Sequence, residues 1–181
     1  MTTAATPASS IAVGTAPTAR QQFLDSYERE HETTMRLLRA YPPEESELRP
    51  HPKLKSAREL AFIFVGEAQL GIAGLNNVFA SGNVGGARPA VPEKWEDVLS
   101  AIETAHVDFR QVFESFTDEQ LQEPIKFFVG PKTLGDYSRL GFAWFLLSDQ
   151  IHHRGQLSIY LRIAGGKVPS IYGPTADEPW S

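Results

Sequence analysis

Three polar residues interrupt an otherwise apolar helical pattern near the end of the chain. Between residues 141 and 166, apolar and aromatic residues, with three polar ones among them, recur every three or four positions. This spacing predicts a helix with one inward face. That face comprises Phe142, Leu146, Asp149, His153, Gln156, Tyr160 and Ile163. Asp149 and His153 stand one turn apart, and burying them is costly without a metal ion or a hydrogen-bonded partner. The pattern predicts either a metal site or a paired Asp–His hydrogen bond.

Glu67 is a second charged residue in an apolar setting. It is the only charged residue from Leu60 through Ala87. On a helix it would share a face with Leu60, Ile63, Leu70, Gly74 and Val78. A solvated glutamate usually has polar neighbours on its own face, so we expect Glu67 to be buried and paired.

The composition excludes several classes of function. The chain has 181 residues, a net charge of -5 and a pI near 5.5, and no run of five basic residues, all of which argue against a nucleic-acid partner. It has no cysteine, so disulfides, thiolate catalysis and cysteine-based zinc sites are excluded. Metal chemistry would have to use His, Asp and Glu. No GxGxxG, P-loop or GxSxG pattern occurs.

The first residues differ in composition from the rest of the chain. Residues 1–17 are rich in Thr, Ala, Ser and Pro, which predicts a disordered tail, and residues 18–181 are expected to form a single domain. The tail lacks the charged and apolar regions of a secretory signal, and no apolar run approaches a membrane span. We therefore expect a cytoplasmic protein with no membrane partner.

The elements that must position the polar residues are four amphipathic helices. They are expected at residues 18–41, 57–79, 93–116 and from Thr133 or Leu134 to 166, with a short helical turn after Thr117. Ser56 and Glu59 form a capping-box pattern at the start of the second helix. Residues 124–132 are expected to be an irregular connection that covers one end of the helices, and no convincing strand is found. The sequence predicts an all-α four-helix bundle.

Three further residues carry specific expectations. Gly155 lies inside the last helix, where glycine is costly, so we expect a neighbouring helix to pack closely against it. His31 lies close to the inward face of the first helix, as a boundary residue or a ligand. His106 is expected to be a packed core histidine or an interface residue.

Several segments together resemble one known family. They are YEREHETTMRLLRAYPPEE, LRPHPK, ELAFIFVGE and HHRGQLSIYLRIAGGKVPSIYGPTADEPW, and they span the chain from about residue 20 onward. The chain resembles the DinB/YfiT-like metalloenzyme family. The resemblance implies a four-helix bundle of up-down-down-up type, often a homodimer, that binds a divalent metal through three histidines. Characterised relatives include transferases and isomerases that use low-molecular-weight thiols, and the family name implies no DNA binding.

The resemblance carries over to this chain with changes in the ligand residues. His153 matches the last family histidine, and Asp149 stands where the histidine four residues earlier would be. The histidine of the second helix falls at Ile63, one turn before Glu67. The implied metal ligands are therefore Glu67, Asp149 and His153, which would suit Zn, Ni, Fe or Mn. Alternatively the site is degenerate, and the two carboxylates share a proton or pair with His153 or Arg154.

Two classes of function follow from these residues. In the first, the protein is a metal-dependent enzyme, a transferase or hydrolase acting on a small molecule, in which the ion activates a water or a small thiol. His152, Gln156 and His31 are then candidates for the substrate pocket, and no catalytic residue is assigned. In the second, the protein is a non-catalytic, stress-associated bundle with a vestigial, metal-free site.

Overall fold

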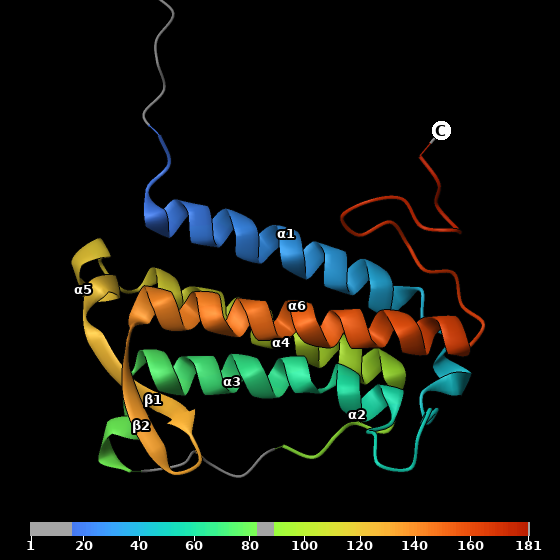
Figure 1. Cartoon of the computed structure of the whole chain (residues 1–181), viewed down its shortest axis with the longest axis horizontal. Helices are drawn as coiled ribbons and strands as arrows, with labels where there is room; N and C mark the ends of the chain where they lie inside the picture. The colour runs from blue at the N-terminus through green and yellow to red at the C-terminus, as the bar shows by residue number, and fades with distance from the viewer. Residues whose placement is uncertain (1–15, 83–88, 181) are drawn as a thin grey trace, which may run out of the picture.

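The computed structural model describes residues 16–82 and 89–180, and this part of the chain is mostly helical. Figure 1 shows the long helices side by side, with a small hairpin across one end. The elements are α1 (Ala19–Arg39), α2 (Ala57–Ala61), α3 (Ile63–Leu75), α4 (Trp95–Glu114), α5 (Asp118–Gln122), β1 (Pro124–Gly130), β2 (Thr133–Ser138) and α6 (Arg139–Ile163), with short 3-10 turns at Pro43–Glu45 and Val78–Ser81. Residues 164–180 contain no helix, so the last helix ends three residues before the expected residue 166. Of the predicted tail, only residues 16 and 17 lie within the described ranges.

The predicted helix starts are confirmed where capping residues mark them. Ser56 and Glu59 make both hydrogen bonds of a capping box at the start of α2. Thr117 and Gln120 make the same pair of bonds at α5. The side chain of Thr18 caps α1 by accepting from the backbone N–H of Gln21. Local hydrogen bonding therefore fixes these boundaries.

The prediction of one continuous helix over residues 57–79 is wrong. A turn at Phe62 separates α2 from α3, and the hydrogen bond from Gly66 N to Phe62 O is long, at 3.4 Å. No proline or glycine precedes this turn, so the local sequence does not indicate it. The helix ends at Leu75 because Asn77 adopts a left-handed conformation with φ 54°. The side chain of Asn77 then accepts a hydrogen bond from Lys126 N of β1.

The all-α prediction is also wrong in one respect, because β1 and β2 form an antiparallel hairpin. Ile125 and Phe127 alternate toward the interior, and the ring of Phe127 lies 4.7 Å from that of Phe142 on α6. This period-two alternation is what stabilises a half-buried strand. The hairpin replaces the predicted irregular connection and delays the start of the last helix to Arg139. It does cover one end of the helices, as expected (Figure 1).

Close packing of α3 against α6 brings the predicted polar residues together. A Cβ on Gly74 would lie 2.1 Å from Cε1 of Phe142, and one on Gly71 would lie 2.9 Å from Cδ1 of Leu146. Because Gly71 and Gly74 have no side chains, α3 can lie close to α6 at these positions. Gly155, in contrast, meets nothing within 4 Å and is exposed, so within this chain the expectation of close packing there is wrong.

None of the helices in the described ranges is long and apolar enough to cross a membrane.

Candidate metal centre

Two neighbouring helices supply three potential metal ligands at the same height. Glu67 comes from the middle of α3, and Asp149 and His153 come from successive turns of α6. One ligand atom from each residue lies within 4.8 Å of the ligand atoms of the other two. The structure therefore brings together all three residues that the sequence predicted as ligands.

The distances at this cluster fit one shared cation. Nε2 of His153 lies 3.2 Å from Oε1 of Glu67 and 3.8 Å from Oδ1 of Asp149. Donor atoms that each lie about 2.1 Å from one ion are spaced in this way. The side chain of Asp149 is 44% exposed, whereas those of His153 and Glu67 are 18% and 7% exposed. The cluster is therefore closed at Glu67 and reachable from solvent at Asp149.

Glu67 is the most buried member of the cluster, and its carboxylate lacks good hydrogen-bond donors among the described residues. Both of its carboxylate oxygens are buried, and neither accepts a well-aligned hydrogen bond from the described residues. Burial raises the pKa of Glu67 to about 7, against the lowering effect of His153. Contact with Glu67 in turn raises the pKa of His153. A buried carboxylate with free lone pairs beside an imidazole is the kind of site that a divalent cation would complete.

Two of the three predicted substrate-pocket residues lie beside this cluster. Gln156 lies one turn beyond His153, with its Oε1 3.3 Å from Nδ1 of His153. Its Nε2 lies 2.9 Å from Nε2 of His152, which is exposed. Gln156 therefore lies within hydrogen-bonding distance of His153, and His152 is linked to His153 only through Gln156.

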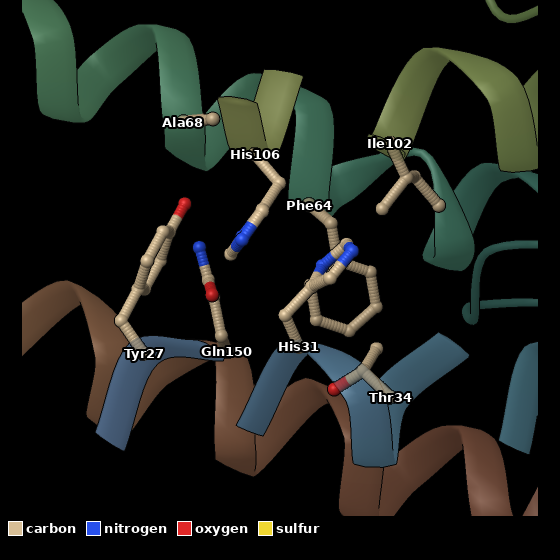
Figure 2. Close-up of a pocket in the computed structure, with 8 residues that line it drawn as sticks. All are labelled: Tyr27, His31, Thr34, Phe64, Ala68, Ile102, His106 and Gln150. Atoms are coloured by element: carbon tan, nitrogen blue, oxygen red, sulfur yellow. The ribbon is translucent and has the colours of Figure 1, made fainter. Parts of the chain in front are cut away.

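The third predicted pocket residue, His31, lies in a separate cavity between α1, α3, α4 and α6 (Figure 2). Figure 2 shows Tyr27 and His31 of α1, His106 of α4 and Gln150 of α6 directed toward this space. The cavity volume of about 20 Å³ is close to that of one bound water. It is too small for a substrate, so His31 does not join His152 and Gln156 in one pocket.

The two histidines of this cavity are stacked rather than convergent. Their ring centroids lie 3.7 Å apart at an interplanar angle of 15°, and the ring of Tyr27 stacks on the other side of His106 at 4.4 Å. Parallel imidazoles direct their lone pairs side by side, which does not suit a shared metal ion. Burial lowers the pKa of both histidines, that of His31 to about 4. His106 is buried, in agreement with its prediction as a packed core histidine.

Sequence reasoning did not predict the burial of Arg154 and assigned the wrong inward face to part of α6. Arg154 is only 1% exposed, whereas Ile163, expected inside, is 53% exposed. Arg154 lies seven residues after Leu147 and seven before Leu161, both buried, and this heptad spacing could have revealed it. It pairs with Glu30 at 2.7 Å and donates to the hydroxyl of Tyr172. Arg154 therefore serves the packing of α1 and is not part of the metal cluster.

Known proteins resemble this chain in sequence and in fold. The profile of the DinB family matches residues 92–180. The uncharacterised protein YrdA of Bacillus subtilis strain 168 is 36% identical over 92 residues, which are 50% of this chain and 52% of YrdA. The chain thus spans about half the length of this curated relative.

Two solved structures extend the likeness to most of the chain. A DinB-like protein from Bacillus cereus ATCC 10987 is 25% identical, with a TM-score of 0.67 over 83% of this chain and 95% of that one. A DinB-like protein from Bacillus subtilis has a TM-score of 0.65 over 83% of this chain and 96% of that one, but at 18% identity it supports the fold alone. The profile match and the shared fold define a DinB-like protein. The chain belongs to the DinB family.

Proposed function

We propose that this protein is a divalent-metal-dependent enzyme, a transferase or hydrolase that acts on a small molecule at Glu67, Asp149 and His153. The observation that carries the proposal is the buried Glu67 carboxylate, which lies 3.2 Å from Nε2 of His153 and accepts no well-aligned hydrogen bond from the described residues. Two carboxylates and one imidazole would suit Mn, Fe, Zn or Ni. The bound ion would lower the pKa of a coordinated water or small thiol so that it could attack an electrophile.

The chain's own residues would hold and expose this centre. Glu67 supplies a ligand from the closed side, and the partly exposed Asp149 leaves an approach for substrate. His152 and Gln156, which lie at the same surface, would contact a substrate that enters from there. The up-down-down-up order of the four long helices, a cytoplasmic location and a homodimer without nucleic-acid or membrane partners belong to the same proposal.

Metal content and metal-dependent stability test the proposal directly. Elemental analysis of protein purified without added metal should find close to one divalent ion per chain. In thermal unfolding, a metal at about 100 times its Kd should raise the midpoint by about 5–10 °C over the chelator-treated protein. Asp149→Ala and His153→Ala should lose most of this shift. Asp108→Ala, which removes an exposed carboxylate on α4, should keep it.

The alternative function is a non-catalytic bundle in which His153 and Glu67 pair with each other. Their separation of 3.2 Å is short enough for an ion pair. In that case no metal would shift the unfolding midpoint, and an experimental structure would show the three side chains together without an ion. This outcome would overturn the proposed function.

A further inference from the structure

The amide of Gln156 lies between two imidazoles, and its two ends have opposite hydrogen-bonding character. Oε1 lies 3.3 Å from Nδ1 of His153, and Nε2 lies 2.9 Å from Nε2 of His152. An amide oxygen can only accept a hydrogen bond, and an amide NH2 group can only donate. Nδ1 of His153 must therefore carry a proton in this arrangement, and Nε2 of His152 must present a lone pair.

This arrangement determines what neutral His153 presents to the cluster. With its proton on Nδ1, the ring directs the lone pair of Nε2 toward Glu67 and Asp149. Nε2 of His153 lies 3.2 Å from Oε1 of Glu67, and among the described residues neither oxygen of Glu67 has a well-aligned donor. A nitrogen lone pair that faces carboxylates is repelled by them when no ion is present. A divalent cation between them would be attracted to both, because metal ions bind the unprotonated nitrogen.

The opposite amide orientation would weaken metal binding at this site. If the oxygen and nitrogen of Gln156 exchanged places, the amide would donate to Nδ1 of His153. The imidazole proton would then lie on Nε2 and face Glu67 and Asp149, where it would compete with a cation. The two orientations differ by a rotation of one amide, and in the structure it is Nε2 of Gln156 that faces Nε2 of His152, at 2.9 Å.

We propose that Gln156 is a positioning residue that selects the Nδ1–H tautomer of His153 and so keeps Nε2 free for a divalent cation, with His152 fixing the direction of the amide. This inference rests on the proposed function, since it assigns Gln156 and His152 to the support of the metal site. It gives both residues a role that does not depend on the identity of the substrate.

The tautomer of His153 and the zinc affinity of the full chain test this proposal together. Long-range 1H–15N correlation spectra of chelator-treated wild type should show His153 protonated on Nδ1. Gln156→Met preserves side-chain length but removes both hydrogen bonds, so the proton should move to Nε2 and zinc affinity should fall about 10–100-fold. Gln156→Glu keeps an acceptor toward Nδ1, so the Nδ1–H tautomer should persist and zinc should bind at least as tightly as in wild type.

Control variants separate this effect from general damage. Gln111→Met, which changes an exposed glutamine on α4, should leave both readouts unchanged. His152→Leu should weaken zinc binding less than Gln156→Met, because Oε1 of Gln156 can still accept from His153. An unchanged affinity in His152→Leu would remove His152 from the proposal.

Failure of the inference is distinguishable from failure of the proposed function. Wild-type protein that binds no divalent metal would overturn the proposed function, while the tautomer of the chelator-treated protein would still be measured. An Nε2–H tautomer in that protein would overturn the inference. So would a Gln156→Met variant that keeps the wild-type tautomer and binds zinc within twofold of wild type.

Discussion

Glu67 occupies an environment that opposes its charge, since burial raises its pKa to about 7 and neither oxygen accepts a well-aligned hydrogen bond from the part of the chain that the structure describes. The folded state therefore binds a proton more readily than the unfolded state. Without metal, the stability gained from this proton is fully present below the usual pKa of a glutamic acid and is lost as pH rises through about 7. A bound cation would reverse the effect by stabilising the carboxylate.

Glu67→Gln tests this balance because the amide stays neutral at every pH. In chelator at pH ~8.5, the variant should be more stable than wild type by about 1–3 kcal/mol, and near pH 4 the two should be similar. Added zinc should stabilise wild type but not the variant. Urea unfolding at both pH values measures these differences. A variant that is less stable than wild type at high pH in chelator would show instead that His153 stabilises the ionised Glu67.

His31 and His106 predict a separate dependence of stability on pH. Burial lowers the pKa of both, so the unfolded chain binds more protons than the folded chain below the usual histidine pKa. Their contribution is present at neutral pH and is lost as pH falls from about 6.5 toward 4. After allowance for the partial exposure of His31, the loss should be about 1 kcal/mol. His31→Phe should flatten this part of the urea-unfolding profile, whereas His51→Gln, at an exposed loop position, should leave it unchanged.

The sequence contained enough information to place the three candidate ligands but not all of their surroundings. Glu67 could be found because no other charged residue occurs nearby in the chain, and Asp149 and His153 because they interrupt an apolar pattern. The burial of Arg154 was not predicted, because a single arginine on a helix is ordinarily solvated. Its partners, Glu30 and Tyr172, are also distant in sequence. Long-range pairs of this kind become visible only in the fold.

At the scale of elements, local signals predicted where helices begin better than where they end or break. Capping boxes at Ser56 and Thr117 depend on residues three positions apart, so the sequence contains them in full. The turn at Phe62 has no local marker. The hairpin was missed because its strand pattern is short and its stability comes from packing onto Phe79 and Phe142.

A buried charge network joins α1, α6 and the C-terminal segment. Arg154 pairs with Glu30 at 2.7 Å, and the hydroxyl of Tyr172 donates to Glu30 at 2.7 Å and accepts from Arg154. Arg154 and Glu30 are 1% and 8% exposed, so removal of either one leaves the other charge buried without its partner. Replacing both with apolar residues removes that penalty.

Arg154→Met and Glu30→Leu should each destabilise the fold by about 3–5 kcal/mol, and the double variant should lose clearly less than the sum. Tyr172→Phe should cost about 1–2 kcal/mol and should increase amide exchange in residues 164–180. Arg39→Met, which breaks an exposed ion pair with Glu103, should cost no more than about 1 kcal/mol. Strictly additive losses for Arg154 and Glu30 in urea unfolding would contradict this coupling.

At the scale of the whole molecule, α6 presents an apolar stripe to solvent on the side away from the core. Trp144, Gly155, Ile159 and Ile163 are exposed and follow one another at helical intervals along this stripe. The side chains of Ile159 and Ile163 are 61% and 53% exposed. Gly155 has open space above it, which would let a helix of another chain approach closely. The cost of glycine inside a helix would then be offset between chains, although it is not offset within one.

A twofold homodimer with α6 against α6 would cover this stripe, since a twofold interface places the same surface of both chains in contact. We therefore expect light scattering to give a dimer mass at micromolar concentration. Ile159→Glu should shift the mass to that of a monomer, because it would bury two like charges near the twofold axis. Val107→Glu, which adds the same charge at an exposed apolar position of α4, should remain dimeric. A monomeric wild type would show that the stripe is not covered in this way, and equal dissociation of both variants would place the interface elsewhere.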